Sequence, residues 1–205
     1  MMTFSEIISK NNELNDKIEN EDKLSIKIIS NITLHQLKPI LEYSLNSNNI
    51  LCSVTIGEYD NIIKESLEIS NEIPIIFWEI SNLYDGFAFE IENFEAQKIN
   101  LLKERIFLEL DSLFSNLSDC KSVVFNKFSH FAFSHSLYEK SKFQTFVEDL
   151  NYYLNNNKPK NFQIIEIDKC ISICSVENSF NFRNFYSSKS LYSTSFFKTY
   201  SKFLH

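Results

Sequence analysis

The feature that most constrains the fold is a regular alternation of short apolar runs with amphipathic stretches, which begins at Leu24. The apolar runs have strand length, and the third is almost continuously hydrophobic, as is typical of strands buried on both faces of a parallel sheet. They cover residues 24–30, 50–56, 73–80, 122–128 and 162–167. Helical patterns separate them, at residues 34–46, 94–117 and 141–155, and the turn at residues 57–60 leads into a further helical stretch that runs to about Leu67. Five strands separated by helices predict a three-layer α/β sandwich with a mainly parallel sheet in the flavodoxin-like order 2-1-3-4-5.

The remaining segments complete a two-part organisation. Residues 1–23 are polar and acidic and predict a short helical arm, while residues 24–205 form the α/β domain. Near the end of the chain, 168–190 reads as irregular and 193–204 as a final helix. In the first crossover, Thr33 stands where a helix N-cap would lie, so we expect its hydroxyl to cap the helix of residues 34–46.

Charge and composition exclude several classes of protein. The formal net charge is −7 and the basic residues are scattered, which argues against nonspecific nucleic-acid binding. No apolar stretch reaches the roughly 18–20 residues of a membrane span, and the polar start is no signal peptide. A cytoplasmic protein is the simplest interpretation. The four cysteines lack zinc-site spacing, so we expect structural thiols, no metal site and no cofactor.

A doubly wound sheet binds its ligand over the carboxyl ends of its strands. Familiar phosphate chemistry is not indicated there, because the sequence has neither a Gly-x-Gly-x-x-Gly turn nor a Walker lysine motif. The first strand ends in the neutral pair Ser30-Asn31, where a response regulator needs acidic residues, and no strand ends in Asp-x-Asp as a haloacid-dehalogenase phosphatase requires.

Three short motifs carry a family resemblance. They are the turn Ser30-Asn31-Ile32-Thr33 after the first strand, Gly57-Glu58-Tyr59-Asp60 after the second, and Arg183-Asn-Phe-Tyr-Ser-Ser-Lys189 before the last helix. Over residues 24–204 the chain resembles the amino-terminal SGNH-hydrolase-like domain of FkbH-like proteins. Those proteins usually continue into a haloacid-dehalogenase domain, which this sequence lacks up to His205. The resemblance implies polysaccharide or secondary-metabolite biosynthesis, with an acyl-carrier protein or a haloacid-dehalogenase-type partner or domain.

The resemblance also shows what the hydrolase machinery lacks. An SGNH hydrolase uses a serine after the first strand, and a late histidine that activates it as general base. Here Ile32 or Thr33 occupies the serine position, and the late segment has no histidine. Thr33 could still act as a nucleophile instead of a helix cap. His130, after the fourth strand, could reach the cleft as its base, or be an ordinary loop histidine.

Other residues at the strand ends are candidates for substrate binding. Asn82 and Asp85 follow the third strand at the place of the family's oxyanion asparagine, although an asparagine at such a place more often forms a turn. Arg183 and Lys189 could bind a phosphate or carboxylate, unless Arg183 pairs with Glu177 at the surface. The candidate substrate-binding residues are Ser30, Asn31, Tyr59, Asn82, Asp85, Arg183 and Lys189.

Three functional hypotheses follow from the sequence. The first is a module without hydrolase activity that positions a carrier- or sugar-linked substrate or docks a partner enzyme. The second is an active acyltransferase or esterase with a rearranged site built on Thr33 and His130. The third is a protein-interaction domain whose aromatic loop 176–192 forms the contact surface.

Overall fold

The computed structural model describes residues 2–17, 23–133 and 139–204. Five parallel strands form one sheet in the order β2-β1-β3-β4-β5, so the predicted fold class and strand order are confirmed. The strands are β1 (Leu24–Ser30), β2 (Cys52–Ile56), β3 (Ile73–Phe77), β4 (Val123–Asn126) and β5 (Phe162–Ile165).

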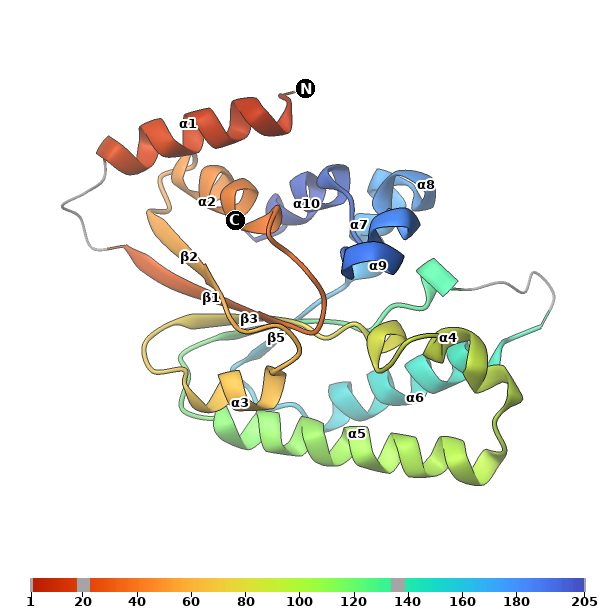
Figure 1. Ribbon diagram of the computed structural model, residues 1–205. Helices are drawn as coiled ribbons and strands as arrows, with labels where there is room; N and C mark the ends of the chain where they lie inside the picture. Colours follow the sequence, from red (N-terminus) through yellow and green to blue (C-terminus); the bar gives the residue numbers. More distant parts are fainter. Residues whose placement is uncertain (1, 18–22, 134–138, 205) are drawn as a thin grey trace.

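Helices cover both faces of the sheet (Figure 1). One layer contains α1 (Phe4–Lys17), α2 (Leu37–Asn46), α7 (Ile167–Cys174), α8 (Val176–Ser179), α9 (Phe182–Ser188) and α10 (Thr194–Ser201). The other contains α3 (Ile62–Leu67), α4 (Phe87–Glu90), α5 (Ala96–Asn116) and α6 (Lys142–Asn157). Single 3₁₀ turns lie at Ile80–Asn82, Ile91–Asn93 and Phe131–Phe133.

Burial of the sheet explains why its strands are so apolar. Ile28 and Ile29 are neighbours on β1, point to opposite faces, and are both fully buried. Aromatic side chains fill the layers on either side, with Phe196 and Phe197 from α10 and Phe143 from α6 fully buried. No helix within the described ranges combines the length and the apolarity that a membrane span requires.

The leading helix α1 lies on α2. Its Ile7 is buried, and the Asn11 amide donates a hydrogen bond of 2.9 Å to the buried carboxylate of Glu42 on α2. Of the segment predicted as a helical arm, residues 18–22 lie outside the described ranges. The boundary at residue 23 therefore stays a prediction.

The prediction that Thr33 caps the first crossover helix is wrong. Helix α2 begins at Leu37, and its N-cap residue is Gln36, whose side chain makes no capping hydrogen bond. Thr33 lies four residues earlier, and its backbone and side chain are bound elsewhere: the N–H donates to the Lys189 carbonyl at 3.0 Å and the hydroxyl to the Ser188 carbonyl at 2.7 Å. Thr33 therefore bonds to the distant residues Ser188 and Lys189 instead of capping the nearby helix.

The segment expected to be irregular, 168–190, instead lies within the run of short helices α7, α8 and α9. Ser175 caps α8 by accepting a hydrogen bond from the Asn178 N–H, and Asn181 caps α9 by accepting one from the Asn184 N–H. Serine and asparagine resemble loop residues in the sequence, but here they act as N-caps. Strand β3 is also shorter than predicted, because the Glu79 side chain caps the 3₁₀ turn that follows it.

Candidate functional site

The carboxyl ends of β1 and β3 are joined by the amide side chain of Asn31. Its Oδ1 accepts a hydrogen bond from the Glu79 N–H at 2.7 Å, and its Nδ2 donates to the Glu79 carbonyl at 2.9 Å. Asn82 returns the contact, because its Nδ2 donates to the Asn31 carbonyl at 2.6 Å and to the Tyr59 hydroxyl at 3.1 Å. Both asparagines are buried. These amides therefore hold together the loops that follow β1, β2 and β3.

Ser30 lies in the same corner of the sheet, by which we mean the loops that follow β1, β2 and β3. Its buried hydroxyl donates to the Ile32 carbonyl and accepts a hydrogen bond of 3.0 Å from the Ile32 N–H. This is a local turn of the kind that serine hydroxyls make with backbone two residues further on. The hydroxyl is thus used in shaping the turn.

A buried carboxyl group lies directly behind the corner. Glu79 accepts hydrogen bonds of 2.9 Å from the Ser81 hydroxyl and 2.9 Å from the Tyr192 hydroxyl. Burial raises the pKa of Glu79 above its ordinary value, and the nearby Asp168 adds to the effect. Burial also raises the pKa of Tyr192 well above its ordinary value, followed by the charge of Glu79. The hydrogen bond between Tyr192 and Glu79 connects the end of β3 to the segment before α10.

Thr33 and Lys189 form the second side of the corner. The Thr33 hydroxyl donates to Ser188, and Lys189 adopts a left-handed backbone with φ of 58°. The ammonium of Lys189 contacts the carboxylate of Asp85 and lies 5.4 Å from the ring centroid of Phe185. Two predicted substrate-binding residues, Asp85 and Lys189, are therefore paired with each other.

His130 lies beyond β4, half-buried, with its ring 5.1 Å from the Phe131 ring. Its charge adds to the lowering of the pKa of Glu148 on α6, for which Lys140 is the main cause. Within the described part of the chain no hydrogen bond connects His130 to Thr33, and its buried Nδ1 has no hydrogen-bond partner there.

Arg183 is exposed on α9. Over the ranges that the structure describes, no ion pair joins it to Glu177.

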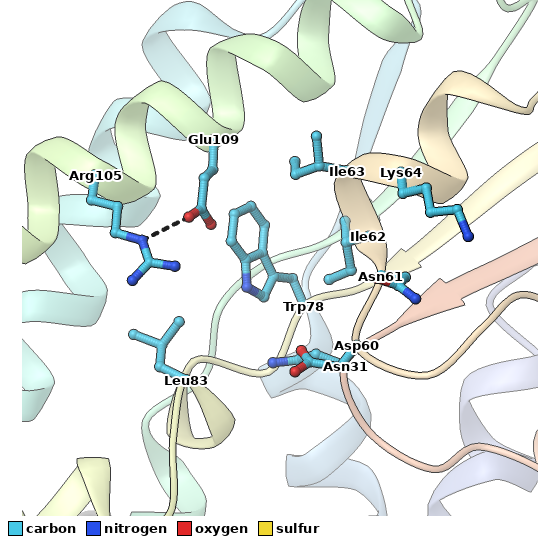
Figure 2. Close-up of a pocket in the computed structure, with 10 residues that line it drawn as sticks. All are labelled: Asn31, Asp60, Asn61, Ile62, Ile63, Lys64, Trp78, Leu83, Arg105 and Glu109. Carbon is cyan, nitrogen blue, oxygen red and sulfur yellow. Dashed lines mark hydrogen bonds and ion pairs between the residues drawn. The ribbon is translucent and has the colours of Figure 1, made fainter.

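Two pockets open beside the corner. The smaller, of about 190 Å³, contains the Asp85–Lys189 pair and is lined by Ser81, Asn82, Tyr84, Asp85, Gly86, Phe185, Tyr186 and Lys189. The larger, of about 310 Å³, lies on the α3 and α5 side (Figure 2). Its lining is Asn31, Asp60, Asn61, Ile62, Ile63, Lys64, Trp78, Leu83, Arg105 and Glu109. No group of three His, Cys, Asp or Glu side chains suited to a metal ion occurs among the residues described.

The sequence interpretation missed most of the larger pocket. Asp60 ends the Gly-Glu-Tyr-Asp motif, and Trp78, the single tryptophan, follows β3 directly. The sequence pattern therefore indicated that both lie near the ends of strands. Arg105 and Glu109 lie in the middle of α5, far from any strand end, and no sequence signal placed them there. Helix α5 brings them over the sheet edge only through tertiary packing.

Comparison with known proteins identifies the fold and no family. No protein-family model matches the sequence, and no curated protein sequence matches it. Among solved structures, the chain is similar to the N-terminal part of the protein BF1531 from Bacteroides fragilis, described as containing a phosphatase domain and complexed with Mg. The TM-score is 0.74 at 14% sequence identity, over 98% of this chain and 55% of that one. This chain thus spans about half the length of that structure.

Proposed function

We propose that this chain is a module without hydrolase activity, which positions a sugar- or carrier-linked substrate at the carboxyl edge of its sheet. We place it with the SGNH-like domains of FkbH-like proteins, in polysaccharide or secondary-metabolite biosynthesis. Its partner would be a haloacid-dehalogenase-type domain or an acyl-carrier protein. The observation that carries the proposal is the state of the corner, where the hydroxyl and amide groups of Ser30, Asn31, Thr33 and Asn82 all make hydrogen bonds within the chain.

The chemistry of acyl transfer explains why this observation matters. A hydroxyl nucleophile needs a general base within hydrogen-bond reach to take its proton. The Thr33 proton is directed at the Ser188 carbonyl, 2.7 Å away, and a backbone carbonyl is no base. Asn82, at the place of an oxyanion donor, directs its amide at Asn31 and Tyr59. The corner is built to be rigid, while the two flanking pockets remain available for a ligand.

The partner assignment has separate support. The solved structure that this chain resembles is described as containing a phosphatase domain, and this chain covers only 55% of it. A fold of this kind therefore occurs within a longer structure that is described as containing a phosphatase domain. Size-exclusion chromatography of this chain with a purified haloacid-dehalogenase-type domain from the same organism would test docking. Separate elution at micromolar concentrations would remove that part of the proposal.

Hydrolysis of p-nitrophenyl acetate tests the absence of hydrolase activity. We expect the purified chain, Thr33→Ala and the matched control Thr145→Ala on α6 all to give the rate of buffer alone. Thermal unfolding of each variant shows that it is folded. Cleavage well above buffer that Thr33→Ala abolishes and Thr145→Ala leaves intact would overturn the proposal.

The same assay separates the second candidate, an esterase or acyltransferase that uses Thr33 with His130. The unpartnered Nδ1 of His130, as the described residues show it, is the observation in its favour. That candidate requires His130→Asn to abolish cleavage together with Thr33→Ala.

A further inference from the structure

The larger pocket is built from four parts of the chain that meet at the sheet edge, one of which is the loop after β1 with Asn31. Asp60 and the start of α3 form one wall, α5 contributes Arg105 and Glu109, and Trp78 comes from the end of β3. Figure 2 shows the indole of Trp78 in the middle of the lining residues. The volume of about 310 Å³ lies at the lower end of the range for ligand pockets. A ligand of the size of one six-membered ring is therefore appropriate.

The charges that line this pocket are paired, with one exception. The Arg105 Nε is 2.9 Å from the Glu109 carboxylate, and the Lys64 ammonium is 3.0 Å from the carboxylate of Glu58. No lysine or arginine in the described ranges forms an ion pair with Asp60. Asp60 is exposed, and the neighbouring loop and helices desolvate its carboxyl enough to raise its pKa, with a further contribution from the nearby charge of Glu109. Among the charged groups that line the pocket, Asp60 is thus the one without an ion-pair partner in the described ranges, and it is the group that a bound cation would contact.

Asp60 is held in place by its backbone. Its φ of 58° lies in the left-handed region, and its N–H donates a hydrogen bond of 3.1 Å to the Ser30 carbonyl. Asparagine and aspartate tolerate this backbone conformation better than other non-glycine residues. The carboxylate is therefore presented from a fixed loop, which lowers the entropic cost of binding.

Trp78 supplies the second element of recognition. The residue is only 6% exposed, and its ring packs in a T-shaped arrangement on Phe128, with ring centroids 6.1 Å apart. Only the small exposed part of its indole lines the pocket, and a tryptophan ring contributes about 0.5–2 kcal/mol to the binding of an organic cation that lies over it. A carboxylate and an indole on one small pocket suit a protonated amine.

We propose that this pocket binds a protonated amine carried on a small polar ring, an amino sugar, with Asp60 as counter-ion and Trp78 as aromatic wall. The inference rests on the proposed function in placing the ligand at the carboxyl edge, and it specifies the chemistry of that ligand. A neutral sugar of the same size would lack the ion pair. Part of the attraction is electrostatic and acts between solvent-exposed charges, so binding weakens as the salt concentration rises.

The test uses the intrinsic fluorescence of the protein, since Trp78 is its only tryptophan. Glucosamine is titrated at pH 7, with glucose and N-acetylglucosamine as ligands that have the same ring and no charge. We expect a saturable change in Trp78 emission with glucosamine, and an affinity at least about tenfold weaker for both neutral sugars. Isothermal titration calorimetry repeats the comparison for Trp78→Phe, for which we expect a severalfold loss.

Asp60→Asn isolates the counter-ion, and the matched control Asp119→Asn removes an exposed carboxylate in the turn before β4. We expect Asp60→Asn to weaken the binding of glucosamine about tenfold or more and Asp119→Asn to leave the affinity unchanged. Thermal unfolding of each variant checks that it is folded. The inference would be overturned by equal affinity for charged and neutral sugars, by an Asp60→Asn variant that binds glucosamine as tightly as the wild type, or by the absence of a saturable signal. The ester assay is independent of each of these outcomes, so a failure here is distinguishable from a failure of the proposed function.

Discussion

Replacing Glu79 by glutamine should stabilise the protein increasingly as pH rises. The Glu79 carboxyl is buried, and burial raises its pKa above the ordinary value of 4.5. Unfolding exposes the group to water, where it ionises at that ordinary value. The contribution of Glu79 to stability is therefore complete below pH 4.5 and is lost as pH rises through the pKa of the folded state. Glutamine has the same shape and does not titrate.

The magnitude follows from this linkage. While only the unfolded state has lost the proton, the free energy of unfolding of the wild type falls by about 1.4 kcal/mol per pH unit. The hydrogen bonds from Ser81 and Tyr192 stabilise the ionised form and limit the total. Since leaving a buried polar group poorly compensated costs about 1–3 kcal/mol, we expect Glu79→Gln to gain that much on the wild type between pH 5 and pH 8.

Urea denaturation at pH 5, 6, 7 and 8 measures the free energy of unfolding of Glu79→Gln and of the wild type. In the difference between the two, the contributions of the other titrating groups cancel. Glu104→Gln, on the exposed side of α5, controls for the loss of one carboxylate. A difference between Glu79→Gln and wild type that stays constant across these four pH values would refute the reasoning, as would one that falls. A constant difference would mean that hydrogen bonding to the carboxylate balances its burial, and a falling one that hydrogen bonding outweighs burial.

Three further substitutions or reactions test the packing. Asn82→Ala removes the two amide hydrogen bonds that join the loop after β3 to the loops after β1 and β2, and should lower the free energy of unfolding by about 1–3 kcal/mol in urea denaturation. Gly57→Ala places a Cβ only 2.5 Å from a carboxylate oxygen of Glu65, so we expect a loss of about 1–3 kcal/mol and a lower Tm. Burial raises the pKa of the Cys52 thiol to about 12, so at pH 8 iodoacetamide should label Cys52 only after denaturant is added, as mass spectrometry of its peptide would show.

The fold could be predicted because its signal is local and repeated. The strands are mostly apolar, as in Ile75–Phe77, which is buried on both faces, and each crossover needs a helix, so pattern and handedness together restrict the strand order. Thr33 shows where local reasoning ends. Its partners, Ser188 and Lys189, are about 155 residues away, and only the folded chain brings their carbonyl groups beside it.

The candidate site was predicted in part for the same reason. Asn31 and Asn82 come directly after strands, so their position at the edge followed from the pattern, but their reciprocal hydrogen bonds did not. Arg105 and Glu109 reach the larger pocket from the middle of a helix of 21 residues. Which turns of a long helix pass over a sheet edge depends on packing angles that the spacing of residues does not contain.

The contact of Thr33 with Ser188 and Lys189 has a consequence for the order in which the molecule forms. Synthesis proceeds from the amino terminus, so the first crossover leaves the ribosome long before the residues that bind it. Until Lys189 is available, the Thr33 N–H and hydroxyl must bond to water, and the loop they anchor has no fixed partner. Contacts of such sequence separation slow folding because their loop closure comes late. The loop that holds Thr33 is therefore expected to be among the last parts of the chain to become ordered.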